Sequence, residues 1–326
     1  MSKTSEKPTI FVTRRWPDAA EEALKQYFTP TFNEQDVPLT AAQIAAGFAS
    51  HDALAPTVSD QITADIIAAG AAGSGRLIAN FGVGVNHIDL AAAASAGLAV
   101  SNTPGVLTDA TADLALTLML MVSRRAGEGE RELRAGKWHG WRPTHLMGRS
   151  LSGKTLGIIG MGRIGKAVAH RAALGFGMKI IFFNRSKVTD ITDYDAKQID
   201  DLDALCAQSD FLSLHCAASA DTFHILNEYR LQRMPAHAYV INTARGDVID
   251  EAALVRALHN GSIGGAGLDV FQGEPDIHPD ILTAPNTVLL PHLGSATVET
   301  RTAMGMKVVE NARAFFAGKR LIDPVV

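Results

Sequence analysis

The sequence of 326 residues lacks most features of a secreted, membrane-spanning or nucleic-acid-binding protein. Its two cysteines exclude a disulfide framework and fit a reducing compartment. The net charge of −4 offers no basic excess to neutralise phosphates. The longest apolar run, Leu114–Val122, is too short to cross a bilayer, and Met1–Lys7 lacks the apolar core of a signal peptide. We therefore expect a cytoplasmic protein that binds neither nucleic acid nor membrane.

Metal ligands show no recognisable pattern either. The eleven histidines include no pair at the spacing of a His-Glu-x-x-His helix, and no Cys-x-x-Cys occurs, so we expect no metal. The hydrophobic fraction of 47% and the charged fraction of 20% are typical of a globular protein. The chain is longer than one hydrophobic core usually covers, which favours two domains.

Strands and helices are predicted to alternate along the chain, which favours parallel sheets with helices on both faces. In the first hundred residues, the predicted strands are Thr9–Thr13, Asp52–Ala55, Arg76–Asn80 and Leu98–Ser101, with helices over Pro17–Phe28 and His87–Ala96. From Lys154 the predicted strands are Thr155–Ile159, Lys179–Phe183, Phe211–His215, Tyr239–Thr243, Gly265–Val270 and Thr287–Leu290. Ser295–Phe316 is predicted to be one helix, capped by Ser295 or Thr297.

Two segments between these series stand out. The stretch from about Asp109 to Arg125 is apolar on all sides, which predicts a helix at a buried interface or between domains. Lys137–Ser150 has no periodicity and carries Trp138 and Trp141, so it is predicted to be an extended arm. Because tryptophan is enriched at interfaces, we expect this arm to contact another subunit; the alternative is a loop folded onto its own domain.

Gly160-Met161-Gly162-Arg163-Ile164-Gly165 is a Gly-x-Gly-x-x-Gly motif in its confirming context, since it follows an apolar strand and opens a predicted helix. Gly160 permits the tight turn, Gly162 lets the backbone approach a pyrophosphate, and Gly165 lets the helix lie close to the sheet. The helix start offers free N–H groups to the anion. The motif predicts a nicotinamide dinucleotide site.

The strand after this helix ends at Asn184-Arg185-Ser186-Lys187, where an NAD site would place a carboxylate for the ribose 2′-hydroxyl. No carboxylate is present. Arg185 can instead pair with a 2′-phosphate in bidentate fashion, with Ser186 and Lys187 adding donors. This favours NADP(H). NAD(H) is the alternative, with Arg185 stacking on adenine.

Three later strand ends offer the groups that reduction of a 2-oxo acid needs. Arg245 follows one strand and can clamp the substrate. Asp269 closes the next strand, with Glu274 just after it. His292 follows the last strand, and a neighbouring Glu would fix the tautomer of this proton donor.

These signatures occur in the order and spacing of one family. Over essentially its whole length, the chain resembles the D-isomer-specific 2-hydroxyacid dehydrogenases. The residues that carry the resemblance are Gly160–Gly165, Asn242–Asp247, Gly267–Val270 with Glu274-Pro275, and Pro291–Ser295. Within the family it is most similar to glyoxylate/hydroxypyruvate reductases, because of Asn184-Arg185-Ser186 and the segment Asn80–Asp89.

The resemblance implies a role for each site residue. His292 would be the acid/base paired with Glu274, Arg245 would hold the substrate, and the N–H groups of Val83 and Gly84 would bind its carboxylate. Asp269 would contact the nicotinamide end of the cofactor. Ser295 and Trp141 complete the expected substrate-binding residues. The residues expected to bind the cofactor are Gly160, Gly162, Arg163, Ile164, Gly165, Asn184, Arg185, Ser186, Cys216, Ala217, Thr243, Arg245, Asp269, His292 and Gly294.

The resemblance also implies an α/β fold of two doubly wound parallel-sheet domains with a cleft between them. Residues 1–101 plus 292–326 would form a flavodoxin-like substrate domain, and residues 102–291 a Rossmann cofactor domain. Closure of the cleft would expel water. The family further implies a homodimer, with Trp141 as the candidate for an arm residue that reaches the active site of the partner subunit.

The function expected from these features is NADP(H)-dependent reduction of glyoxylate to glycolate or of hydroxypyruvate to D-glycerate. An alternative is an NAD-linked dehydrogenase for D-lactate or a bulkier 2-hydroxy acid. A remote alternative is a dinucleotide-sensing protein similar to the C-terminal-binding corepressors. The sequence does not distinguish the physiological 2-oxo acid or the direction of the reaction.

Overall fold

The computed structural model describes residues 7–326, so all but the last residue of the Met1–Lys7 segment lies outside the described residues. The chain divides into an N-terminal unit, Met1–Leu107 with Ala296–Val326, and a central unit, Thr108–Ser295. Both boundaries lie a few residues later than the sequence predicts. The first moves because helix α5 begins at Thr108, and the second because the turn after the last strand is hydrogen-bonded to Asp269 of the central unit.

The N-terminal unit is built on a five-stranded parallel sheet with the order β2-β1-β3-β4-β5. This is the flavodoxin-like doubly wound order that the family resemblance implies. The strands are β1 (Thr9–Val12), β2 (Thr29–Phe32), β3 (Ala53–Ala55), β4 (Leu77–Ala79) and β5 (Ala99–Ser101), and the helices are α1 (Asp18–Tyr27), α2 (Ala41–Ser50), α3 (Ala64–Ala72), α4 (Leu90–Ser95) and α12 (Val298–Phe316).

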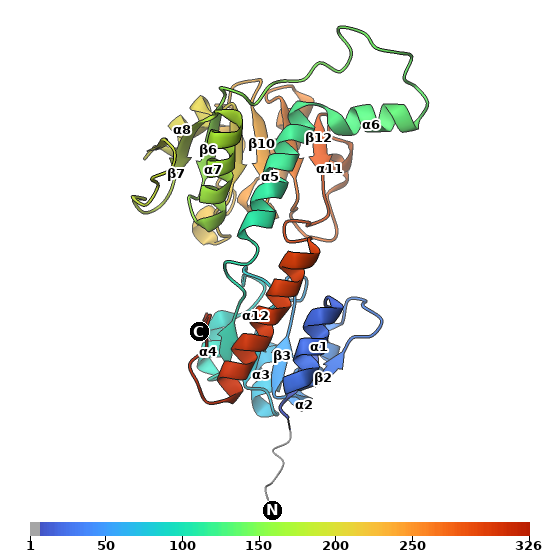
Figure 1. Cartoon of the computed structure of the whole chain (residues 1–326), viewed down its shortest axis with the longest axis vertical. Coiled ribbons are helices and arrows are strands. Elements are labelled where there is room, and N and C mark those ends of the chain that lie inside the picture. The colour runs from blue at the N-terminus through green and yellow to red at the C-terminus, as the bar shows by residue number, and fades with distance from the viewer. Residues whose placement is uncertain (1–6) are drawn as a thin grey trace, which may run out of the picture. The chain divides into compact units, whose positions relative to one another are not determined.

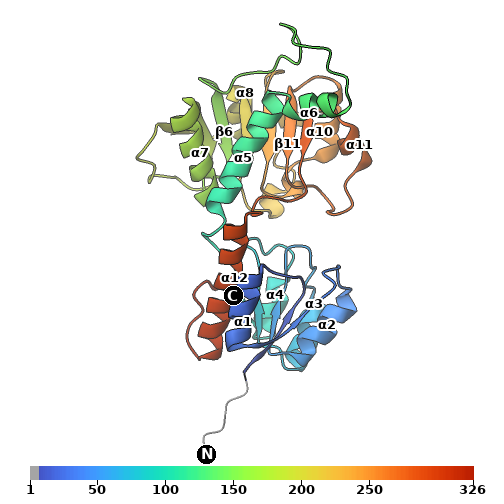
Figure 2. The ribbon, with the colours of Figure 1, turned by 45° about the vertical axis from the view of Figure 1, so that its right-hand side comes forward.

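Alternating side chains of these strands build two hydrophobic layers, one on each face of the sheet. Ile10 and Val12 pack with α1 and α12, whereas Phe11 and Leu54 pack with α2 and α3 (Figure 2). The last helix of the chain therefore completes a core that the first hundred residues begin.

Two predicted helix starts in this unit need correction. The helix predicted from His87 begins at Leu90, because the Asp89 side chain accepts a hydrogen bond from the Ala92 N–H and caps it there. The long C-terminal helix begins at Val298, with Thr297 as its cap, so Ser295 does not cap it.

The central unit carries a seven-stranded parallel sheet with the order β12-β11-β10-β9-β6-β7-β8. The strand order reverses between β6 and β9, which is where dinucleotides bind in doubly wound folds. The strands are β6 (Thr155–Ile159), β7 (Lys179–Phe183), β8 (Ala196–Gln198), β9 (Phe211–Leu214), β10 (Tyr239–Asn242), β11 (Gly265–Leu268) and β12 (Thr287–Leu289). The helices are α5 (Thr108–Ser123), α6 (Ala126–Arg134), α7 (Arg163–Phe176), α8 (Leu202–Gln208), α9 (Glu228–Leu231), α10 (Glu251–His259) and α11 (Pro279–Thr283), with 3₁₀ turns η1 (Ala220–Thr222) and η2 (Gly246–Val248).

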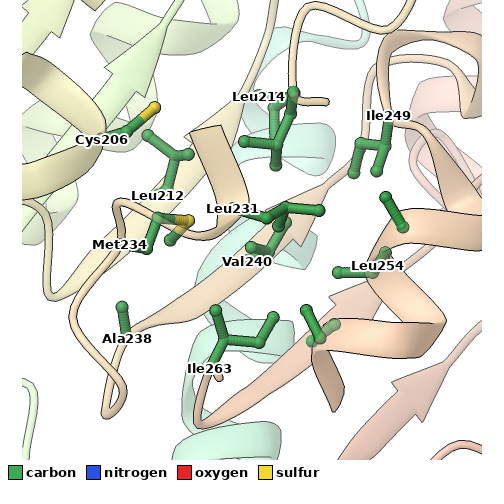
Figure 3. Close-up of a cluster of buried hydrophobic side chains, with 14 of the residues drawn as sticks. Cys206, Leu212, Leu214, Leu231, Met234, Ala238, Val240, Ile249, Leu254 and Ile263 are labelled. Atoms are coloured by element: carbon green, nitrogen blue, oxygen red, sulfur yellow. The ribbon is translucent and has the colours of Figure 1, made fainter. Parts of the chain in front are cut away.

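Both faces of this sheet are covered by helices. Helices α5 and α7 lie over one face, in front of the strands in Figure 1. Helices α8 to α11 cover the other, where Leu212, Val240 and Leu254 belong to one buried cluster (Figure 3). A sheet fixed on both faces can hold the loops at its strand ends in defined positions.

The apolar helix and the arm follow the predictions. Ala112, Ala115, Leu118 and Met119 of α5 are fully buried. No helix or strand forms over residues 137–150, and Trp138 and Trp141 are 51% and 81% exposed. Helix α6 was not predicted, since its residues are mostly charged or small. Within residues 7–326, no helix is both long and apolar enough to cross a membrane.

Candidate active site

The glycine motif forms the turn between β6 and α7. Gly160 has a φ of 96°, and a Cβ atom there would lie 2.6 Å from the backbone nitrogen of Cys216. At Gly165 a Cβ atom would lie 2.2 Å from the Gly160 carbonyl oxygen. The fold itself thus requires both glycines. A Cβ atom at Gly162 would meet no atom within 4 Å, so space for a ligand remains on that side of the turn.

The start of α7 fits the anionic part of a dinucleotide. Gly162 is the N-cap, and no side chain of the described residues caps this end. Arg163 and Ile164 open the helix, and N–H groups in a first helical turn have no partner within the helix. Such N–H groups, with the helix dipole, bind phosphate readily.

The loops after β9 and β10 lie at the same edge of the sheet. Cys216 follows β9 and packs against Gly160, and Ala217 is exposed beside it. Thr243 follows β10, and its Oγ1 lies 3.4 Å from Nδ1 of His215. Burial lowers the pKa of His215 to about 3, so this side chain is neutral at physiological pH.

The segment after β7 is held by hydrogen bonds that leave its cationic side chains exposed. The Asn184 Oδ1 accepts from the Met161 N–H at 3.1 Å, which ties this segment to the glycine turn. The Asn184 Nδ2 donates to the Ser186 carbonyl oxygen at 2.9 Å and lies 3.1 Å from its Oγ. Arg185 and Lys187 are exposed, and neither has a hydrogen-bond or ion-pair partner among residues 7–326.

His292 and Glu274 form a pair in the central unit. The His292 Nδ1 lies 2.8 Å from the Glu274 Oε2, and the Oε1 accepts from the Phe271 N–H at 2.8 Å. Burial opposes ionisation of Glu274, but His292, the Phe271 N–H and Arg245 together hold its pKa below the usual range. With Nδ1 engaged, Nε2 is the nitrogen that can exchange a proton with a ligand.

The turn that carries His292 has a constrained backbone. His292 has a φ of 55°, a conformation that residues other than glycine rarely adopt. Asp269 holds this turn, because its carbonyl oxygen accepts from the His292 N–H at 2.9 Å. Its carboxylate accepts from the N–H groups of Leu293 at 2.7 Å and Gly294 at 2.8 Å. Burial raises the pKa of Asp269 to about 6, against these hydrogen bonds and the attraction of His292.

Arg245 lies in the loop after β10, close to the segment that carries Glu274. A Cβ atom at Gly246 would lie 1.9 Å from the Phe271 carbonyl carbon, so the two loops are in direct backbone contact. The Asn242 Nδ2 donates to the Arg245 carbonyl oxygen at 2.8 Å and fixes the start of this turn. Burial lowers the pKa of Arg245, which Glu274 partly offsets, and a guanidinium stays protonated at neutral pH.

The Val83–Gly84 loop belongs to the N-terminal unit, and its carbonyl groups point to buried or half-buried amides. The Asn80 Nδ2 donates to the carbonyl oxygens of Gly82 and Gly84, each at 3.0 Å, and the Asn102 Nδ2 donates to that of Val83 at 2.8 Å. Among residues 7–326, no hydrogen bond is found from the N–H of Val83 or Gly84. A loop with its N–H groups available suits a carboxylate.

Within the central unit, two sequence-predicted residues are not joined to the others. Trp141 lies in the arm and makes no hydrogen bond or ring contact within the described part of the chain. Ser295 is half-buried at the end of the central unit. In residues 7–326, no group of three or more His, Cys, Asp or Glu side chains could hold a metal ion.

Sequence reasoning missed several residues that hold the site in place. Asn80 lies in the segment Asn80–Asp89, which carries part of the family resemblance, but no role was predicted for its side chain. Asn102 belongs to no motif, and neither does Gln198, whose Nε2 donates to the carbonyl oxygens of Asn184 and Ser186. Buried Glu251, at the start of α10, accepts from the Gln272 N–H at 2.6 Å and so holds the Glu274 segment. These roles depend on contacts between distant parts of the chain, which no local pattern reveals.

The chain is similar to known oxidoreductases over nearly its whole length. The family model for the NAD-binding domain of D-isomer-specific 2-hydroxyacid dehydrogenases matches residues 116–294. A glyoxylate reductase from Korarchaeum cryptofilum is 41% identical over 96% of this chain and 94% of its own.

Solved structures agree. An NADPH-dependent glyoxylate/hydroxypyruvate reductase from Sinorhizobium meliloti, in complex with NADP and malonate, is 34% identical with a TM-score of 0.88. The alignment covers 98% of this chain and 97% of that one. A glyoxylate reductase from Paecilomyes thermophila is 36% identical with a TM-score of 0.84, covering 98% of each chain. The chain is therefore an oxidoreductase that belongs to the D-isomer-specific 2-hydroxyacid dehydrogenase family.

Proposed function

We propose that this protein reduces small 2-oxo acids, glyoxylate to glycolate and hydroxypyruvate to D-glycerate, with NADPH as the preferred donor. The observation that carries the proposal is the His292–Glu274 pair at 2.8 Å, at the same sheet edge as the glycine turn and Arg245. The names of the relatives, glyoxylate reductase and glyoxylate/hydroxypyruvate reductase, support the substrate class.

When bound, NADPH would supply the hydride that reduces the carbonyl carbon of the substrate. Arg245 binds the carbonyl and carboxylate oxygens of the substrate. His292 donates the proton from Nε2 to the carbonyl oxygen, so that the C=O bond becomes CH–OH. Glu274, kept ionised by its low pKa, orients the imidazole through Nδ1 and stabilises its protonated form.

The proposed preference for NADPH rests on the segment after β7. Arg185 and Lys187 have no protein partner among residues 7–326, so their charges are available to a 2′-phosphate. No carboxylate stands in Asn184–Lys187 to repel it. The Sinorhizobium relative, described as NADPH-dependent, supports the same choice.

We also propose a homodimer in which the arm is an interface. Leu133, Trp138, Trp141 and Met147 are 62%, 51%, 81% and 66% exposed, an unusual concentration of large apolar side chains. Sedimentation of the purified protein tests this. A monomer at micromolar concentration would contradict the dimer without touching the proposed chemistry.

The decisive experiment measures kcat/KM for glyoxylate, hydroxypyruvate, pyruvate and phenylpyruvate, each with NADPH and with NADH. We expect the two small substrates with NADPH to give the highest values. Faster turnover of pyruvate or phenylpyruvate with NADH would instead identify an NAD-linked dehydrogenase. Cofactor binding without turnover of any 2-oxo acid would favour a sensor.

A further inference from the structure

Gln198 is the last residue of the edge strand β8, and its side chain reaches across to the segment after β7. Its Nε2 lies 3.3 Å from the Asn184 carbonyl oxygen and 3.2 Å from the Ser186 carbonyl oxygen. Its Oε1 accepts from the Val188 N–H at 3.1 Å. One amide therefore contacts both ends and the middle of the segment that carries Arg185.

The position of Gln198 is fixed by the sheet, independently of this segment. Gln198 pairs with Phe182 of β7 in the sheet, and the next residue, Ile199, donates its N–H to the Phe182 carbonyl oxygen at 2.8 Å. Gln198 is half-buried, whereas Arg185, Ser186 and Lys187 are exposed. Gln198 thus holds the backbone of the segment, while the side chains of Arg185, Ser186 and Lys187 are exposed.

We infer that Gln198 is a positioning residue for cofactor discrimination, which holds the backbone of Asn184–Val188 so that Arg185 and Lys187 can pair with a 2′-phosphate. The inference rests on the proposed preference for NADPH. Ordering a flexible loop on binding reduces affinity, and a loop already held in place avoids that loss. NADH lacks the 2′-phosphate, so the held geometry favours NADPH alone.

The test uses Gln198→Met, which keeps the length of the side chain but removes its amide. The matched control is Gln208→Met, because within residues 7–326 the exposed Gln208 donates only to the Ala204 carbonyl oxygen of its own helix. Dissociation constants for NADPH and NADH are measured by nucleotide fluorescence, and those for 2′,5′-ADP by calorimetry. Steady-state rates with glyoxylate give KM and kcat separately.

We expect Gln198→Met to weaken NADPH and 2′,5′-ADP by about tenfold, the scale of the hydrogen bonds removed, with NADH nearly unchanged. At saturating NADPH, kcat should stay near that of the wild type. If Gln198 acts through Arg185, the double variant with Arg185→Ala should bind NADPH no more weakly than Arg185→Ala alone. The control should match the wild type.

Four outcomes would overturn the inference. Equal weakening of NADPH and NADH would show that Gln198 has only a structural role. Unchanged dissociation constants for both would show that the segment keeps its conformation without Gln198. Fully additive losses in the double variant would show that Gln198 does not act through Arg185. A wild-type protein that binds both nucleotides equally would overturn the NADPH preference as well, so the two failures are distinguishable.

Discussion

The turn that carries His292 and the segment after β7 both follow strands of one sheet, but they differ in whether their charged groups have partners among residues 7–326. At the turn, the protein supplies both sides of each interaction: Glu274 pairs with His292, and Asp269 holds the backbone. In the segment, the backbone is held but the charges of Arg185 and Lys187 have no partner within residues 7–326.

The difference separates two kinds of preorganisation. A group whose geometry is completed by the protein serves every substrate equally, so its loss should reduce turnover with both cofactors. A charge that the protein leaves to a ligand serves only the ligand that carries the opposite charge. Its loss should alter the preference between cofactors and leave turnover nearly intact.

The largest effect is expected for His292→Ala, which removes the proton donor. Turnover with NADPH and with NADH should fall by about 10²- to 10⁴-fold, the usual contribution of general acid catalysis. NADPH affinity, measured by fluorescence, should fall far less than turnover. His259→Ala, at an exposed histidine on α10, is the control and should retain full activity. Near-normal turnover in His292→Ala would remove His292 from the mechanism.

Gly246→Ala tests whether the acid/base site depends on backbone fit. A Cβ atom there would lie 1.9 Å from the Phe271 carbonyl carbon, so the segment that carries Glu274 must move. A displacement of this kind should lower kcat by about 10²-fold with either cofactor. Gly175→Ala is the control, since a Cβ atom at that helical position meets nothing within 4 Å. If Gly246→Ala folds and turns over normally, the loop contact does not position Glu274.

Arg185→Ala tests the segment after β7 instead of the turn that carries His292. We expect about a tenfold increase in KM for NADPH, the order of a lost charged hydrogen bond, with KM for NADH and both kcat values nearly unchanged. Arg233→Ala, at an exposed arginine stacked on Tyr229 in the same unit, controls for a general loss of charge. Equal losses for the two cofactors would contradict recognition of the 2′-phosphate by Arg185.

Glu274→Gln should give the smallest change, a moderate loss of kcat. The carboxylate orients the imidazole through Nδ1, so its replacement by an amide weakens that orientation. With either cofactor, kcat should fall by about fivefold, the scale of one weakened hydrogen bond. The low pKa of Glu274 keeps it ionised at neutral pH in the wild type. An unchanged kcat would show that the pair is only structural.

Much of the fold was predictable because the buried strands are short apolar runs bounded by turn residues. Strands β6, β7, β9, β10, β11 and β12 were found within two residues of their ends. The edge strands β2 and β8 were not predicted, unlike the edge strands β5 and β12: β2 contains Pro30 and is largely exposed, and β8 is three residues long and mostly polar. Edge strands lack the burial on both faces that gives central strands their apolar pattern.

The residues of the candidate site also divide into those that the sequence predicts and those that it does not. Gly160 and Gly165 were predictable because close backbone contacts admit only glycine, and such positions leave a motif. Asn80, Gln198 and Glu251 were not, because each acts through a side-chain hydrogen bond to the backbone of another segment. Any polar residue in a strand or at a helix start presents the same local pattern.

The position of α12 has a consequence for how the chain is made. Val308, Val309 and Ala312 complete the hydrophobic layer formed by β1, β3, β4 and α1, but they follow the whole central unit in sequence. During synthesis, residues 108–295 emerge and can fold while the N-terminal unit still has an uncovered apolar face. The nascent chain therefore passes through a stage in which the central unit can be folded while the N-terminal unit still exposes an apolar face and is prone to aggregate. Synthesis of α12 provides the helix that covers this face.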